Sequence, residues 1–244
     1  MSDVSAARRY LATTHDLLAR LLEHEWPSIS SAADLVASAL ESGGTLHTFG
    51  TGHSHMLAEE LFYRAGGLVR VKPILFEGLM LHASAPLGTS LERLPGLAAA
   101  LLDDHPVVAG DVLMIASNSG GNAVTSELAQ LARGASVPVI AITSLRHATS
   151  ADTRSSTFPR LHELADVTID NGGCAGDAAV RIDGFERAVG PTSTVVGAAI
   201  VNAIAVGAIE RLVARGLAPD VYTSSNIKGG DEANAKLPQA GGGA

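Results

Sequence analysis

An apolar run that passes through a small polar turn into a helical pattern constrains the fold more than any other feature. Residues 111–132 begin with the apolar run DVLMIA, continue through the turn SNSGGN at 117–122, and then follow a helical pattern. Glycines such as Gly120 let a ligand approach the backbone, and a helix start presents free N–H groups and a positive dipole end. With the hydroxyls of Ser117 and Ser119, this turn suits a phosphate monoester. The alternative is a plain capping turn that closes a strand–helix unit.

A second segment of the same kind lies at residues 45–67. A short apolar run meets the turn GTGHS, residues 50–54, and a helical pattern follows. The segment is not a dinucleotide fingerprint, because that spacing requires glycine where His55 stands, and no Gly-Lys-Ser/Thr of a Walker loop is present. Two such turns after separate strands predict one ligand held between two helix starts, at the carboxyl ends of parallel strands.

The order of apolar runs and helical patterns predicts an α/β fold: a doubly wound five-stranded parallel sheet, or αβα sandwich, with N-terminal helices. Strands are expected at 45–49, 68–76, 111–116, 137–143 and 165–169. Helices are expected at 3–24, with Pro27 as the stop, and at 28–42, 53–65, 92–103, 122–134 and from 192 onward. Pro73 favours an edge position for the second strand. No linker is evident, so we expect a single domain over 1–235 and a disordered tail at 236–244.

Charge and cysteine content exclude several functional classes. The chain has 17 Lys+Arg against 25 Asp+Glu, a net charge of −8, and no basic run. Such a chain is poorly suited to bind nucleic acid or an anionic membrane. The single cysteine, Cys174, excludes an internal disulfide and a cysteine-based zinc site. The polar N-terminus does not resemble a signal peptide, so a cytoplasmic location is expected.

Residues 194–209, TVVGAAIVNAIAVGAI, are almost all small or apolar. The run is shorter than the roughly 20 residues of a membrane span, and Asn202 interrupts it. A helix that is apolar on all sides belongs in a core or in a subunit interface. Together with the leucine-rich N-terminal helix, it predicts a homodimer or homotetramer.

The two turns, FGTGHSH at 49–55 and SNSGGNA at 117–123, resemble those of SIS (sugar isomerase) domain proteins. The ITS end of the fourth strand and the Thr-rich start of the last helix extend the resemblance over nearly the whole chain. The segment GTGHSHMLAEELFYRAGG is most similar to the branch named for phosphosugar and phosphoheptose isomerases. The resemblance implies a five-stranded parallel αβα sandwich, at least a dimer, and a small phosphosugar ligand.

The resemblance also assigns roles to individual residues. It places phosphate contacts on the turn at 117–122, sugar contacts on the first turn, and further hydroxyls just after the fourth strand and at the start of the last helix. The expected ligand-binding residues are Thr51, Ser54, Ser117, Asn118, Ser119, Gly120, Asn122, Ser144, Thr192 and Ser193. Glu60 aligns with the catalytic glutamate of the A-E-E-L segment. Met56 stands where that branch can have a metal-binding histidine, and the branch's second catalytic histidine has no counterpart between 191 and 214, so no metal or other cofactor is expected.

The chemistry of aldose–ketose isomerisation gives independent reasons to consider the same helix. The reaction needs a base for the C2 proton and donors that polarise the carbonyl. Glu60 is the first candidate base and Glu59 the second; the alternative is an exposed helix glutamate. His55 and Glu59 are four residues apart, so His55 could act as an acid oriented by Glu59, or the two could hold a metal with His53.

The C-terminal segment 221–234 is polar and rich in groups that bind ligands. Lys228 could balance phosphate charge or assist ring opening; the alternative is a solvated tail. The sequence as a whole favours an aldose–ketose isomerase that acts on a sugar phosphate by proton transfer. The alternatives are a non-catalytic sugar-phosphate sensor and an amino-sugar-phosphate deaminase or lyase on the same fold. The helices before the domain lack a basic recognition face, which favours the enzyme over a DNA-binding sensor.

Overall fold

A five-stranded parallel sheet forms the centre of this computed structural model, which describes residues 5–150 and 157–238. The order across the sheet is β2-β1-β3-β4-β5. The strands are β1 (Leu46–Gly50), β2 (Val71–Ile74), β3 (Val112–Ala116), β4 (Val139–Thr143) and β5 (Val167–Asp170). The three central strands are buried along their whole length, as expected for strands of a parallel sheet that is covered on both faces. The predicted sheet is confirmed, and Pro73 lies on an edge strand as expected.

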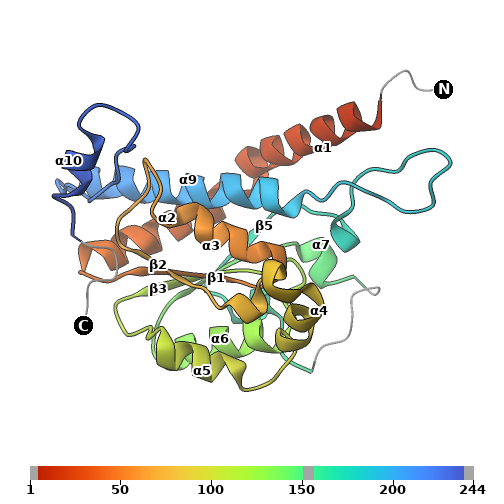
Figure 1. The fold of residues 1–244 in the computed structure, drawn as a ribbon, viewed down its shortest axis with the longest axis horizontal. Coiled ribbons are helices and arrows are strands. Elements are labelled where there is room, and N and C mark those ends of the chain that lie inside the picture. Colours follow the sequence, from red (N-terminus) through yellow and green to blue (C-terminus); the bar gives the residue numbers. More distant parts are fainter. Residues whose placement is uncertain (1–4, 151–156, 239–244) are drawn as a thin grey trace.

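Helices cover both faces of the sheet (Figure 1). One core joins the sheet to α2, α3 and α9, and a second core joins its other face to α5, α6 and α8. The helices are α1 (Ala6–Arg20), α2 (Trp26–Glu41), α3 (His55–Leu61), α4 (Leu81–Leu91), α5 (Leu97–Asp104), α6 (Ala123–Gly134), α7 (Leu145–Ala148), α8 (Leu161–Leu164), α9 (Ser193–Ala214) and α10 (Gly230–Asn234). The result is the predicted αβα sandwich.

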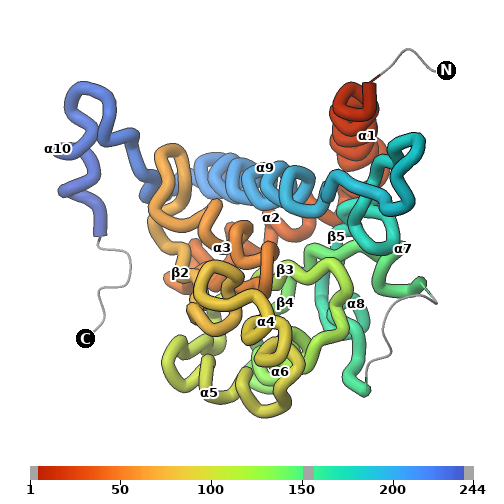
Figure 2. Tube along the Cα trace, turned by 45° about the vertical axis from the view of Figure 1, so that its right-hand side comes forward, coloured from red at the N-terminus to blue at the C-terminus, as the bar shows by residue number. Residues whose placement is uncertain are grey.

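The N-terminal helices differ from the expectation that Pro27 ends the first of them. A π-helical turn, Leu21–Glu25, connects α1 to α2, and Pro27 lies in the first turn of α2. Proline is tolerated there because its missing N–H would have no partner in the first turn of a helix. The chain therefore runs from α1 to α2 without a loop. In Figure 2, α1 extends away from the sheet at the end opposite to α10.

Two other helices differ from their predicted bounds. The helix expected at 53–65 begins with a 3-10 turn, Gly52–Ser54, and ends at Leu61, since Phe62 is extended and Tyr63 has a φ of +45°. The helix expected at 92–103 is the shorter α5, which begins at Leu97, and the preceding α4 was not predicted. They are separated around Gly96, which has a φ of +86° that favours glycine.

By length and composition alone, the helix α9 could cross a membrane. However, half of its most apolar stretch of 18 residues is buried inside the protein. It packs against α2, where Gly207 approaches Ala33 so closely that a Cβ at 207 would lie 3.0 Å from the Ala33 Cβ. Arg211 donates to the Ser30 hydroxyl at 2.6 Å and also pairs with Asp34. These contacts make α9 part of the helical layer above the sheet.

The C-terminal segment returns to the opposite end of that layer. Gly66 donates to the Tyr222 carbonyl at 2.7 Å, and Leu68 forms an isolated bridge with Val221. After α10, Leu237 donates to the Asn234 carbonyl at 3.1 Å. Residues 239–244 lie outside the described part of the chain, so the disordered tail stays a prediction.

Candidate functional site

The carboxyl ends of β1 and β3 lie side by side at the point where the strand order reverses. Gly50 pairs with Ala116 at this edge, and the chain continues from β1 to β2 on one side and from β3 to β4 on the other. Open α/β sheets bind ligands at such a switch point. The two turns identified in the sequence, 51–54 and 117–122, both begin there.

The turn after β3 has a rigid frame and one hydroxyl without a partner. Gly120 has a φ of +62°, and its N–H donates to the buried Ser117 hydroxyl oxygen at 3.1 Å. The Ser119 hydroxyl makes no hydrogen bond within the described residues. Asn122 stands at the N-cap of α6 without capping it through its side chain. The Ser117 hydroxyl thus shapes the turn, whereas the Ser119 hydroxyl remains available to a ligand.

A positive charge lies against this turn. Arg160 donates from Nη1 to the Ser119 carbonyl at 3.1 Å. A Cβ on Gly121 would lie 2.1 Å from the same Nη1, so only glycine leaves room for the guanidinium. Arginine suits phosphate because its planar donors can bind two oxygens at once. The turn therefore combines a guanidinium, the N-terminal end of α6 and a hydroxyl.

The turn after β1 is held by a carboxylate. The Thr51 hydroxyl donates to Glu92 Oε2 at 2.8 Å, and the Ser54 N–H donates to the Thr51 carbonyl at 3.0 Å. Glu92 follows α4, and its own carbonyl accepts the Val124 N–H of α6 at 3.3 Å. Glu92 therefore joins the first turn to the helix that follows the second. The Ser54 side chain makes no hydrogen bond with the described residues. The Ser54 backbone passes so close to Gly50 that a Cβ on residue 50 would lie 2.4 Å from the Ser54 carbonyl oxygen.

His55 begins α3 beside the first turn. Its Nδ1 is hydrogen-bonded to the Gly52 carbonyl, which leaves the lone pair of the neutral ring on Nε2. Glu59 Oε1 is 3.8 Å from that Nε2, close enough to stabilise a protonated ring. His82 of α4 lies edge-on, with the two ring centroids 6.5 Å apart. Glu59 therefore lies on the Nε2 side of the His55 ring, and the role of His55 as an acid oriented by Glu59 stays a prediction.

Glu60 points toward α9. Its Oε1 accepts a hydrogen bond from Asn202 Nδ2 at 2.7 Å, and its Oε2 pairs with Arg64 at 2.6 Å. Its side chain is 23% exposed, compared with 49% for that of Glu59. Asn202, the polar residue within this apolar helix, therefore donates a hydrogen bond to the predicted base.

At the ends of β4 and β5, two predicted ligand contacts already have partners. Asn118 Oδ1 accepts from Asn171 Nδ2 at 2.9 Å. The Ser144 hydroxyl donates to the Gly173 carbonyl at 2.6 Å and accepts the His147 N–H at 3.0 Å. These bonds connect the turn after β3 to the loops after β4 and β5.

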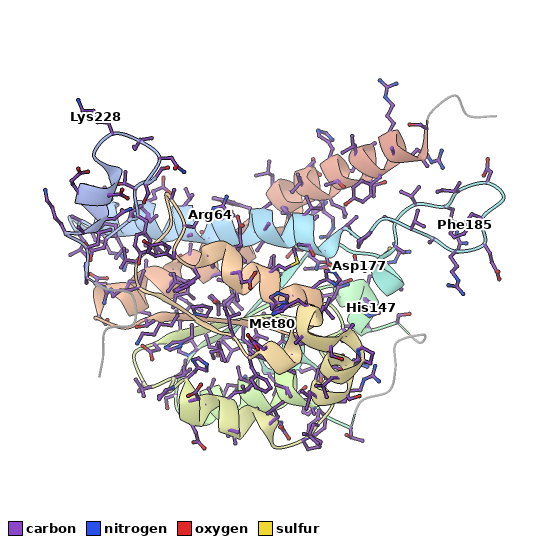
Figure 3. The ribbon with its side chains drawn as sticks, viewed as in Figure 1. Arg64, Met80, His147, Asp177, Phe185 and Lys228 are labelled. Atoms are coloured by element: carbon purple, nitrogen blue, oxygen red, sulfur yellow. The ribbon has the colours of Figure 1, made fainter. Side chains whose placement is uncertain are left out.

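The predicted contacts at the final helix are occupied by Asp177. Its Oδ1 accepts the N–H groups of Thr192 and Ser193, each at 3.0 Å, and its Oδ2 accepts the Ser193 hydroxyl. The carboxylate thus caps α9. Figure 3 shows Lys228 at the end of the molecule opposite to His147 and Asp177, so within one chain Lys228 is remote from this cap.

Across residues 5–150 and 157–238, no group of three or more His, Cys, Asp or Glu side chains could hold a metal ion. Two groups have shifted pKa values, and neither lies in the turns. Burial lowers the pKa of His47, although Asp111 beside it opposes the shift. Burial raises the pKa of Tyr222, with a further contribution from Tyr63.

Sequence reasoning missed the residues that support the turns. Glu92 and Arg160 stand at the ends of helices that are far from the turns in the sequence. No local sequence motif marks either residue. Asn171 could have been predicted from the sequence, because it begins the polar, glycine-rich stretch NGG directly after β5. A polar residue at the end of a parallel strand belongs to the same edge as the two turns.

Comparison with known proteins adds to this geometry. The model of the SIS domain family matches residues 9–144. The chain belongs to the SIS domain family. A UPF0309 protein of Listeria innocua is 41% identical to this SIS protein over 228 residues, 93% of this chain and 92% of the relative. A UPF0309 protein of Streptomyces griseus is 39% identical over 97% of this chain and 95% of the relative.

Solved structures share the fold at low sequence identity. A phosphoheptose isomerase from Francisella tularensis is similar with a TM-score of 0.56 and 16% identity, over 86% of this chain and all of that one. The Vibrio vulnificus NanR protein, complexed with ManNAc-6P, is similar with a TM-score of 0.52 and 16% identity, over 88% of this chain and 66% of that one. At these identities the likeness shows the SIS fold alone.

Proposed function

We propose that this SIS protein binds a phosphosugar at the switch point between β1 and β3 and isomerises it by proton transfer between C1 and C2. The observation that carries the proposal is the turn at 117–122, where Arg160 and the unpartnered Ser119 hydroxyl adjoin the start of α6. A phosphate there would meet a guanidinium, backbone N–H groups and a hydroxyl. The fold shared with a phosphoheptose isomerase and with a NanR protein complexed with ManNAc-6P supports this ligand class.

The open-chain sugar would extend from the phosphate toward the first turn. Thr51 and Ser54 border that side, and a doubly protonated His55 would donate from Nε2 to the carbonyl or ring oxygen. Two carboxylates could take the C2 proton. Glu60 is the base that the SIS resemblance implies, and Glu92 is the carboxylate that lies between the two turns.

The protein would act as a homodimer or homotetramer. On α9, Val206 is 66% exposed and Val213 58% exposed, and on α1 Leu11 is 67% exposed. A helix of this hydropathy with an uncovered apolar side is typical of a subunit interface. The same helix carries Asn202, the partner of Glu60, so assembly would cover the surroundings of the predicted base.

A sugar-phosphate sensor is the second candidate, favoured by the structural likeness to NanR. One experiment separates the two. A panel of aldose and ketose phosphates is incubated with the protein in D2O, after thermal shift has identified the sugars that bind. An isomerase incorporates solvent deuterium at C2, which proton NMR detects. Binding without exchange for every bound sugar would contradict the isomerase and support the sensor.

A further inference from the structure

A pocket of about 830 Å³ lies outside the two turns, between α1, α7 and the segment 174–188. Four arginines line it: Arg9 from α1, Arg146 from α7, and Arg181 and Arg187 from the segment after β5. None of the lining residues that the structure describes is Asp or Glu. Ligand pockets commonly have volumes of about 300–1,000 Å³, so the space suits a small molecule.

Three of these four arginines have no charged partner among the described residues. Arg146, Arg181 and Arg187 form no ion pair and no side-chain hydrogen bond within the described residues. Asp177 lies nearby, but its two carboxylate oxygens are committed to the start of α9. Like charges that share a pocket repel one another, so the cluster is unfavourable until an anion joins it. The chain has only 17 Lys and Arg and a net charge of −8, which makes four arginines in one pocket a strong local concentration.

The wall of the pocket is fixed before any ligand binds. Val180 and Val189 exchange backbone hydrogen bonds at 2.9 and 2.8 Å, and Arg9 donates to the Arg181 carbonyl at 2.7 Å. The Gly176 N–H donates to His147 Nδ1 at 3.0 Å at the base of the segment. Figure 3 shows Asp177 and His147 at this base and Phe185 at the tip. Arginines held on an ordered wall lose less entropy when they bind a ligand.

We propose that this arginine pocket is a second anion site, separate from the turn at 117–122, and that it takes a small ligand with two or more phosphoryl groups. A phosphoryl group carries a charge of about −1.5 to −2, so two of them approach the charge of four guanidinium groups. The planar donors of arginine bind phosphoryl oxygens in pairs. A long polyanion is disfavoured because the rest of the acidic surface repels it.

Cys174 provides a direct probe, because it lines the pocket and is the only cysteine in the chain. The experiment measures the rate at which iodoacetamide, a neutral reagent, alkylates this thiol. Pyrophosphate and fructose 1,6-bisphosphate are the test anions; inorganic phosphate and citrate are compared at matched ionic strength. At a concentration about ten times Kd, a bound diphosphoryl anion should slow alkylation about tenfold. Arg146→Gln and Arg187→Gln should each reduce this protection, and Arg8→Gln, an exposed neighbour on α1 that does not line the pocket, should preserve it.

Several results would overturn the proposal. Equal protection by inorganic phosphate, citrate and the diphosphoryl anions would show screening of charge and no specific site. Unchanged protection in Arg146→Gln and Arg187→Gln would place the anion elsewhere. An altered oligomeric state in these variants, with no effect of pyrophosphate on the wild type, would assign the arginines to a subunit contact. Both arginines are exposed, so the variants should fold, and circular dichroism verifies this. The Ser119→Ala variant should retain protection, since the pocket does not depend on the phosphate turn.

Discussion

The Thr51 hydroxyl donates to the Glu92 carboxylate at 2.8 Å, and this bond joins the turn after β1 to the residue that follows α4. Thr51 begins the turn after β1, and the Glu92 carbonyl accepts the Val124 N–H in the helix that follows β3. A carboxylate placed between two ligand turns can orient a sugar hydroxyl or take a proton from carbon. Two glutamates are therefore candidates for the general base. Glu92 is a candidate because of its position, and Glu60 because of the resemblance to SIS isomerases.

Substitution by glutamine separates them. Glu60→Gln and Glu92→Gln keep the shape of the side chain but remove its ability to accept a proton. Loss of the general base should slow deuterium incorporation at C2 by about 10²–10⁴, with a much smaller change in sugar affinity. Glu210→Gln, an exposed position on α9, is the matched control. If both variants exchange the C2 proton at the wild-type rate, neither glutamate is the base, and Glu59 and His55 become the residues to test.

The fold was predictable because its signals are local. Each central strand is a short apolar run, and the turns that follow β1 and β3 contain the small and polar residues that strand–helix junctions use. The supports of the site were not predictable in this way. Glu92 lies 41 residues from Thr51, and Arg160 lies 41 residues from Ser119. Only the folded sheet brings such pairs together, so their side chains carry no signal along the sequence.

The hydroxyls at the final helix show a different limit of sequence reasoning. The run PTST, residues 191–194, is expected to contact the ligand because it resembles the hydroxyl-rich start of the last helix in SIS proteins. The structure has an anion there from its own chain: the Asp177 carboxylate, 15 residues before Thr192. A sequence shows that a helix start favours a negative charge, but not whether a ligand or a side chain supplies it.

Removal of the Ser119 hydroxyl should weaken phosphosugar binding. Ser119→Ala deletes a hydroxyl without an internal partner, so stability should hardly change while affinity falls by about 1–2 kcal/mol, the value of a charge-assisted hydrogen bond. Calorimetric titration with the best sugar phosphate measures this loss. Ser38→Ala, at an exposed position on α2, should leave affinity unchanged. Full affinity in both Ser117→Ala and Ser119→Ala would remove this turn from consideration as the phosphate site.

Gly121→Ala should displace the guanidinium from the phosphate turn. The new Cβ would lie 2.1 Å from Arg160 Nη1, and the flexible arginine can move away at little cost to the fold. Sugar-phosphate affinity should therefore fall by an amount similar to that of Arg160→Gln, and the double variant should lose little more than either single variant. Additive losses in this cycle would mean that Gly121 and Arg160 act independently.

Charge on the exposed side of α9 should separate the subunits. Val206 is 66% exposed, and lysine at this position would place a charge in the proposed apolar interface. Light scattering should show an oligomer for the wild type and a smaller species for Val206→Lys. Val108→Lys is the control, because Val108 is 58% exposed between α5 and β3, away from α9. A wild type that is monomeric at micromolar concentration would contradict the interface.

His47 should make the protein less stable in mild acid. Its side chain is buried on β1, its Nε2 lies 3.2 Å from Asp111 Oδ2, and burial lowers its pKa. The unfolded chain therefore binds a proton at this residue at a higher pH than the folded chain does. The free energy of unfolding should fall as pH decreases from about 7 to about 5. Above that window His47 is neutral in both states, and it does not destabilise the folded protein.

His47→Gln retains a hydrogen-bond donor for Asp111 but does not titrate, so its urea midpoint should depend less on pH over this interval than that of the wild type. His15→Gln, which alters a histidine whose side chain is 82% exposed, should keep the wild-type slope. Parallel slopes for the wild type and His47→Gln would show that protonation of His47 does not oppose folding.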